Sequence, residues 1–250
     1  MVKMILRDDL GYVKRHRKYI PHDLTTDQKK VRHDGASALI PILKHCKDQE
    51  FRNLITLDET WIRYGTDHEF EWCEPGRTPR PSPKENPYSK NKVLITVAFS
   101  GEGVIFIDAT PPGETITSAY FITNTLNEIA KLPQYQLPSL PHSSNARFFI
   151  HYDNAPCHSS KMTNEALAQT QFCRLPHPPY SPDLSPCGYF LFGTIKPIMK
   201  KTCFLTREEA IQGFVDAVAS LKKDLFVRTM YSWIKRCEQV VESKGEYFAE

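Results

Sequence analysis

The chain has 250 residues, 40% of them hydrophobic and 24% charged, so it can bury the core of one large domain and is not expected to be disordered. Its formal net charge of +3 permits a polyanionic partner without requiring one. Seven scattered cysteines with no CxxC motif are typical of reduced intracellular thiols, and the sequence shows neither a long apolar run nor an apolar leader, which argues against a membrane span and a signal peptide.

The first 50 residues are polar and have a helical pattern. Residues 14–18 form a basic cluster, KRHRK, which is either a solvated helix face or a phosphate contact. Pro21 ends one helix, and Thr25 or Thr26 is placed to cap the next. Residues 36–47 predict a helix with one apolar side that Pro41 interrupts.

A region of strands begins near residue 54. The segment LITLDETW (54–61) predicts a strand that ends in acids. A proline-rich loop with basic side chains follows at 74–91, and this loop is either a DNA contact or an ordinary exposed segment. Residues 92–100 predict a strong strand, and 104–110 its hairpin partner after a glycine turn.

The second half alternates helices and strands. We expect helices at 117–131 and 159–169, a central strand at 147–155 (RFFIHYDNA) and a short strand at 172–176. Four prolines keep 177–186 irregular, and three helices follow, at 187–197, 206–223 and 225–244, of which the first ends at a proline. This order predicts an α/β fold with a central mixed sheet and helices on both of its faces.

Two acids lie where predicted strands end, Asp58 and Asp153. If the two strands are neighbours, both carboxylates reach one divalent ion, and hard oxygen ligands favour Mg²⁺ or Mn²⁺. Such a site can activate a nucleophile at a phosphodiester. Alternatively, each acid caps a turn or faces solvent. Glu59 is expected on the opposite face of its strand.

Three segments resemble the mariner branch of the Tc1/mariner transposases: LDETW (57–61), HYDNAPCH (151–158) and HPPYSPDLSPCGYFLF (177–192). The similarity runs from about Ile5 to the end of the chain. It implies an RNase H-like fold and cut-and-paste cleavage and strand transfer of DNA with Mg²⁺ or Mn²⁺. It also implies transposon terminal inverted repeats as the DNA partner, a homodimer, and a location in the nucleus. Neither a membrane nor a small-molecule substrate is expected.

The resemblance assigns Asp58 and Asp153 as the first two catalytic and metal-binding carboxylates. The family's third acid is separated from the second by 34 residues, and Gly188 holds that position here. Glycine has no ligand to offer, so we expect weak metal binding and a catalytically impaired enzyme. Asp183, five residues upstream, is an alternative source of the missing ligand.

The resemblance also divides the chain into two parts. Residues 1–50 correspond to the residual end of a helix-turn-helix region and its linker, and 51–250 to the RNase H-like DDE/D catalytic domain. We therefore expect most of the sequence-specific DNA-binding region to be missing. The remaining contacts to DNA phosphates are expected from Lys14, Arg15, Arg17 and Lys18.

Subunit contacts in the family map onto two proline-containing segments. The first includes Tyr19, Pro21 and His22, and the second includes Tyr180, Pro182 and Asp183. Alternatively, both segments are rigid connectors within one chain.

Other sites receive less support from the sequence. A zinc site among Cys157, His158, Cys173, His177 and Cys187 lacks the usual ligand spacing, and a Cys–His protease lacks an orienting third group. Cys157 and His158 are expected at the active-site rim. His151 shares a face with Asp153 and either supports the site or is simply buried. Three functions remain open: an impaired transposase, a non-enzymatic DNA-binding or dimerising protein derived from one, and a decaying remnant without function.

Overall fold

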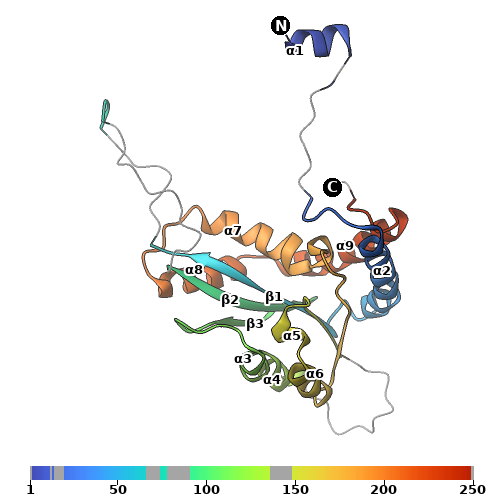
Figure 1. Cartoon of the computed structure of the whole chain (residues 1–250). Coiled ribbons are helices and arrows are strands. Elements are labelled where there is room, and N and C mark those ends of the chain that lie inside the picture. The colour runs from blue at the N-terminus through green and yellow to red at the C-terminus, as the bar shows by residue number, and fades with distance from the viewer. Residues whose placement is uncertain are drawn as a thin grey trace.

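A five-stranded mixed sheet forms the centre of the chain as the computed structural model describes it, in residues 2–11, 13, 20–65, 74–77, 91–135 and 148–248 (Figure 1). The strand order is β3-β2-β1-β4-β5. The strands are β1 (Leu54–Arg63), β2 (Lys92–Ser100), β3 (Gly103–Ala109), β4 (Phe148–His151) and β5 (Phe172–Arg174). The first three pair antiparallel, whereas β4 pairs parallel with β1 and β5 parallel with β4.

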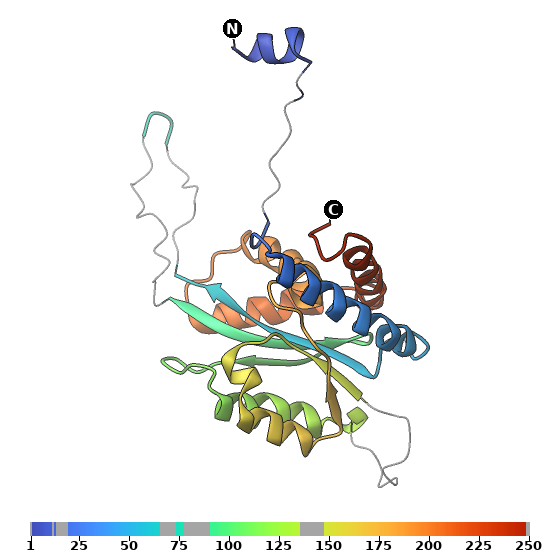
Figure 2. The same ribbon diagram turned by 45° about the vertical axis from the view of Figure 1, so that its right-hand side comes forward.

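Helices cover both faces of this sheet (Figures 1 and 2). One face carries α2 (Thr26–Lys47), the π-helical turn η5 (Cys187–Phe192), α7 (Gly193–Met199), α8 (Arg207–Ala219) and α9 (Lys223–Glu242). The other carries α3 (Ser118–Tyr120), η2 (Phe121–Leu126), α4 (Asn127–Lys131), η3 (Pro133–Tyr135), α5 (Pro156–Ser159) and α6 (Lys161–Ala168). The mixed sheet with helices on both faces, as expected from the sequence, is therefore confirmed.

The two faces have separate hydrophobic cores because neighbouring strand residues point to opposite sides of a sheet. In β1, Leu54 and Ile62 belong to the core under α2, α8 and α9, whose largest buried side chain is Trp233. Ile55 and Leu57 belong to the second core, under α3 to α6. By the same alternation, the even-numbered residues of β1 face η5 and α8.

Two prolines lie within helices that were expected to break at them. Pro41 lies inside α2, which runs unbroken to Lys47. Leu39 and Leu43 on this helix are fully buried, and their burial offsets the lost hydrogen bond of the proline. Pro197 likewise lies inside α7, so the expected end of that helix at the proline is wrong.

Threonine caps mark where two of the long helices begin. Thr25 caps α2 and forms a capping box with Gln28, and Thr206 caps α8. The expected strand at 147–155 is shorter, because β4 ends at His151. The short elements α1 (Val2–Met4), η1 (Ile5–Asp9) and η4 (Pro182–Leu184) complete the described secondary structure.

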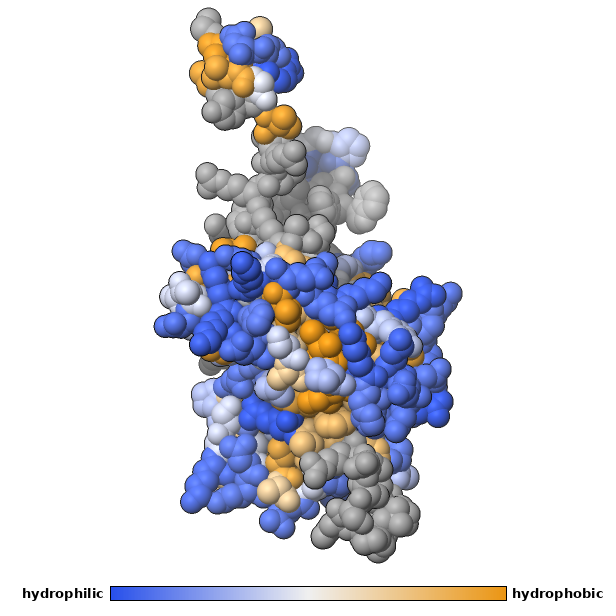
Figure 3. All heavy atoms as spheres, turned by 90° about the vertical axis from the view of Figure 1, so that its right-hand side faces the viewer, coloured by the Kyte–Doolittle hydropathy of each residue, from blue (hydrophilic) through white to orange (hydrophobic). Residues whose placement is uncertain are grey.

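One face of the described chain is mainly polar. Figure 3 shows one face with hydrophilic residues on both sides of a narrow apolar strip. Within the described ranges, no helix combines the length and the apolar character that crossing a bilayer requires. The expected division of the chain near residue 50 stays a prediction, although α2, which precedes that point, packs along α9.

Candidate metal and nucleic-acid site

The parallel pairing of β1 with β4 brings Asp58 and Asp153 to one place. The last paired residues of this ladder are Thr56 and His151. Each aspartate lies two residues beyond its strand's last paired residue, so both emerge at the same edge of the ladder. The expectation that Asp58 ends its strand is wrong, because β1 continues to Arg63 through its antiparallel pairing with β2. Asp58 therefore lies on a continuous strand, whereas Asp153 lies on the loop after β4.

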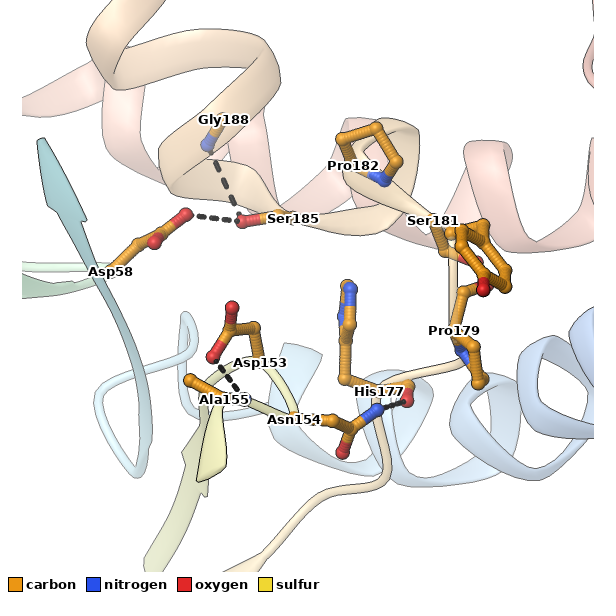
Figure 4. Close-up of a pocket in the computed structure, with 11 residues that line it drawn as sticks. Asp58, Asp153, Asn154, Ala155, His177, Pro179, Ser181, Pro182, Ser185 and Gly188 are labelled. Atoms are coloured by element: carbon orange, nitrogen blue, oxygen red, sulfur yellow. Dashed lines mark hydrogen bonds between the residues drawn. The ribbon is translucent and has the colours of Figure 1, made fainter. Parts of the chain in front are cut away.

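Both carboxylates line one open pocket of about 480 Å³. The remaining wall comes from the loop after β4, the segment before η4 and the start of η5: Asn154, Ala155, His177, Pro179, Tyr180, Ser181, Pro182, Ser185 and Gly188 (Figure 4). The two predicted acids and the predicted degenerate position are thus brought together, although they come from distant parts of the sequence. The pocket has room for an ion and a substrate group.

Gly188 lies opposite the two aspartates, near the start of η5 (Figure 4). Its amide donates to Ser185 Oγ at 3.4 Å, and that hydroxyl donates to Asp58 Oδ2 at 3.3 Å. A Cβ atom at position 188 would lie 3.3 Å from the Pro182 carbonyl oxygen and 3.5 Å from Ser185 Cβ. A side chain therefore fits here if the neighbours shift by a few tenths of an ångström, and π-helical turns such as η5 occur frequently at functional sites.

The surroundings of Asp58 raise the pKa of its carboxyl group and favour a cation beside it. Burial, followed by the charges of Glu59 and Asp153, raises its pKa to about 7. Hydrogen bonds from the Glu59 amide at 2.8 Å and from Ser185 only partly counter that rise. A carboxylate that is costly to ionise next to a second anion gains from any positive ion placed between them.

The surroundings of Asp153 instead lower the pKa of its carboxyl group. The hydrogen bond from His158 Nδ1, 2.7 Å long, is the main reason why its pKa is lowered to about 2, and the Ala155 amide also donates to it. Burial alone would lower the His158 pKa, but the contacts with Asp153 and Glu59 outweigh it and raise that pKa to about 9. His158 Nε2 lies 3.3 Å from Glu59 Oε1, close enough for an ion pair but not aligned for a hydrogen bond. Asp153 is therefore ionised at neutral pH.

Arg174 on β5 fixes the loop that carries Asp153. Its Nη2 donates to the Asp153 carbonyl at 2.9 Å and to Asn154 Oδ1 at 3.2 Å, and its Nη1 donates to the His158 carbonyl at 3.2 Å. Asn154 in turn donates to the carbonyl of His177 at 2.6 Å. The loop after β4 and the pocket wall at His177 are thus held together.

A chain of polar side chains runs behind the pocket. His151 is buried, packs at a tilt against the ring of Trp233, and joins Thr56 Oγ1 through Nδ1 at 3.2 Å. Its Nε2 lies 3.0 Å from His177 Nδ1, and His177 lines the pocket. Thr56 Oγ1 also lies 3.9 Å from the sulfur of Cys187. His151, which was expected to share a face with Asp153, therefore contacts a wall residue rather than the two acids themselves.

Asp183 forms an ion pair with Arg32 and does not line the pocket. Its two carboxylate oxygens accept from the fully buried Arg32 of α2 at 2.9 and 2.8 Å. The same guanidinium donates to Ser181 Oγ, to the Tyr180 carbonyl and to the Gly245 carbonyl. Asp183 is not among the described residues that line the pocket, so it is not placed to supply the third ligand suggested as an alternative.

The two segments predicted to contact a second subunit touch each other within one chain. The ring of His22, which follows Pro21, stacks on Tyr180 with centroids 4.1 Å apart. Tyr180 and Pro182 also line the pocket. Tyr19 lies outside the described residues, and a role of these segments in a dimer stays a prediction.

The predicted DNA-binding residues Lys14, Arg15, Arg17 and Lys18 also lie outside the described residues, as does most of the basic loop at 74–91. Across the described ranges, no three histidine, cysteine, aspartate or glutamate side chains gather in a metal-binding arrangement. Of the residues considered for zinc, His158 pairs with Asp153, His177 pairs with His151, and Cys187 is buried near Thr56.

Sequence reasoning placed His158 at the rim of this site without its contact to Asp153, and it missed Arg174 and Ser185. The hydrogen bond of His158 to Asp153 follows from a tight turn after β4, and the short DNAPCH spacing could have suggested it. Arg174 and Ser185 carry no such signal, because an arginine on a short strand and a serine among prolines are common. Only the fold brings them to the two acids.

Comparison with known proteins agrees with this geometry. The family model of the DDE superfamily endonucleases matches residues 53–211. Over 240 residues the chain is 31% identical to the human histone-lysine N-methyltransferase SETMAR, covering 96% of this chain and 34% of that protein. Over 241 residues it is 26% identical to the Mariner Mos1 transposase of Drosophila mauritiana, covering 96% of this chain and 68% of that protein. The chain thus spans about a third of the first relative and about two thirds of the second.

Solved structures of Mos1 extend the comparison to the fold. The Mos1 catalytic domain matches with a TM-score of 0.72 at 25% identity, covering 92% of this chain and 100% of that domain. The Mos1 paired end complex with Mn matches with a TM-score of 0.80 at 25% identity, covering 99% of this chain and 71% of that chain. The mixed sheet is therefore the RNase H-like fold expected from the sequence.

Proposed function

The chain belongs to the DDE superfamily endonucleases and is homologous to mariner transposases, and we propose that it is a DNA-binding transposase domain with impaired catalysis. The observation that carries this proposal is the pocket in which Asp58 and Asp153 meet and Gly188 takes the third position. The pocket supplies two of the three anionic groups that the family resemblance implies. The reaction class would be cleavage and strand transfer at phosphodiesters of transposon ends.

We propose Asp58 and Asp153 as the residues that hold a divalent cation, Mg²⁺ or Mn²⁺. Their hard oxygen ligands suit these ions, and the raised pKa of the buried Asp58 beside a second anion is relieved by a cation. Mos1 structures have been solved with Mn and with Mg. When bound, the ion would activate a water or hydroxyl and stabilise the leaving oxygen at phosphorus.

Binding of the ion should be weak, because Asp58 and Asp153 are the two anionic side chains among the described residues that line the pocket. Ser185 is the nearest group between Asp58 and Gly188, and its hydroxyl is neutral. A neutral oxygen can occupy a coordination position but does not replace the charge of a carboxylate. The chain's own residues therefore bind and orient the substrate better than they support its cleavage.

We propose transposon-end DNA as the partner and a homodimer as the assembly. Mos1 has been solved in paired end complexes, including one with the left transposon end. In this chain, the stack of His22 on Tyr180 links the segment before α2 to the pocket rim, so chain segments that approach DNA would also shape the site. This function would place the protein in the nucleus.

Gly188 also favours a second function, that of a DNA-binding or dimerising protein without catalysis. Binding needs the pocket walls and basic surface, whereas cleavage needs the full set of acids. The two functions differ in whether any metal-dependent cleavage persists.

Nicking of a supercoiled plasmid in Mn²⁺ separates these functions. We expect the wild-type protein to bind DNA but to nick it slowly or not at all. Gly188→Asp should produce Mn²⁺-dependent nicking, and adding Asp58→Ala to that variant should abolish it. Binding without any nicking in Gly188→Asp would favour the non-enzymatic function. Failure of the wild-type protein to bind DNA would contradict both.

A further inference from the structure

The polar chain behind the pocket ends at a nitrogen whose protonation can be deduced. His177 Nδ1 and His151 Nε2 are 3.0 Å apart, and a hydrogen bond between two imidazole nitrogens requires a proton on one and a lone pair on the other. His177 therefore has two alternatives. Either it accepts at Nδ1 and carries its proton on Nε2, or it donates from Nδ1 and has a lone pair on Nε2.

Thr56 decides between these alternatives. Its Oγ1 lies 3.2 Å from His151 Nδ1 and 3.9 Å from Cys187 Sγ. Because an imidazole lone pair is a better acceptor than a thiol sulfur, the hydroxyl donates to His151 and accepts from the weak donor Cys187. His151 then carries its proton on Nε2 and donates it to His177. The proton of His177 is left on Nε2.

We infer that the Nε2–H group of His177 is a neutral hydrogen-bond donor that faces the pocket and binds a phosphate oxygen of the nucleic acid. This inference rests on the proposed function and adds a substrate-binding residue to it. In Figure 4 the ring stands between Asp153 and the turn at Ser181 and Pro182. A neutral donor suits this position, because it holds an anionic oxygen without bringing a positive charge beside the proposed cation site.

The donor is also preorganised. Asn154 holds the backbone carbonyl of His177 at 2.6 Å, and His151 holds the ring at Nδ1. Trp233 packs against His151 and restricts its ring. Because the ring is already fixed, it loses little conformational freedom when it binds an oxygen, and little of the free energy of the hydrogen bond is offset by that loss.

The first test reads the tautomer directly. Long-range ¹H–¹⁵N spectra of the metal-free protein should show His177 protonated on Nε2 alone. Thr56→Val removes the deciding hydroxyl while keeping the shape of the side chain, and it should introduce the other tautomer. Protonation of wild-type His177 on Nδ1 would overturn the inference and leave the proposed function intact.

The second test uses two replacements of similar size. The amide of His177→Gln reaches the position of Nε2, whereas that of His177→Asn reaches only that of Nδ1. For a short DNA duplex in Mg²⁺, we expect Asn to weaken binding about tenfold and Gln to retain most of the affinity. The salt dependence of binding should be unchanged in both, because a neutral donor releases no counterion. His45→Asn, at an exposed position of α2, is the control.

Each outcome has a definite meaning. Equal affinity of the Asn, Gln and wild-type proteins would overturn the inference while DNA binding itself stands. A salt slope reduced by about one in both variants would identify a charged histidine instead. If inorganic phosphate shifts the His177 resonances and the duplex does not, the site takes a free anion and the nucleic-acid assignment fails. Loss of DNA binding in the wild-type protein would contradict the proposed function itself.

Discussion

Replacing Gly188 with aspartate should tighten divalent-cation binding without disturbing the fold. The new Cβ would lie 3.3 Å from the Pro182 carbonyl oxygen, so the neighbouring turn must shift by a few tenths of an ångström. The substitution also removes a glycine from the start of η5, which favours helical structure by a few tenths of a kcal/mol, up to about 1. We therefore expect the unfolding free energy in saturating Mn²⁺ to equal or exceed that of the wild type.

The expected gain in affinity follows from Coulomb's law. Two unit charges 4 Å apart interact by about 4 kcal/mol at an effective dielectric constant of 20. Part of this is cancelled because the new carboxylate and the cation must both lose hydration when they meet. A net gain of about 1.4 to 3 kcal/mol corresponds to binding that is about ten- to a hundredfold tighter.

Calorimetric titration with Mn²⁺ near neutral pH measures this gain. Gly188→Asn is the matched control, since it has the size of aspartate and an oxygen ligand but no charge, and it should gain little. Equal gains in the two variants would show that charge at position 188 is not what the site lacks. Unchanged affinity in both would refute the assignment of Gly188 to the third ligand position.

Three other predictions concern stability. Asp58→Asn should stabilise the metal-free protein near neutral pH by up to about 4 kcal/mol. Because the pKa of Asp58 is raised, the unfolding free energy of the wild type falls as the pH rises from about 4 to about 7. Urea unfolding at several pH values measures this free energy. The wild type should also lose stability as the pH rises through about 9, because His158, whose pKa is raised, then loses its proton. Thermal melts of His158→Gln should not show this loss. Arg32→Ala should destabilise by about 3 to 5 kcal/mol, since it leaves Asp183 without its partner, and a loss below about 1 kcal/mol in chemical denaturation would contradict that pairing.

The regular parts of the fold followed from local pattern. The run of apolar residues at 92–100 predicted β2 with its observed bounds, and Thr25 and Thr206 marked the starts of two helices. Proline rules failed at Pro41 and Pro197, because tertiary burial on the same helices outweighed the local cost. Local chemistry predicts where a helix can begin more reliably than where it must end.

The site was predictable only in outline. The family resemblance assigned Asp58 and Asp153 to one site, whereas the pattern of the sequence alone brought them together only if their two strands were neighbours. It could not show that Asp183 is bound by Arg32, since those residues are far apart in the sequence and only the fold joins them. The opposite pKa shifts of the two aspartates likewise depend on burial and on His158, neither of which appears in the spacing of the acids.

Locating a bound ion tests the central claim most directly. Crystals soaked in Mn²⁺ and measured at a wavelength where manganese scatters anomalously would reveal its position without reference to activity. We predict one anomalous peak per chain, coordinated by carboxylate oxygens of Asp58 and Asp153 and lost in Asp58→Asn. A peak elsewhere, or ordered aspartates with no peak at saturating Mn²⁺, would contradict the account.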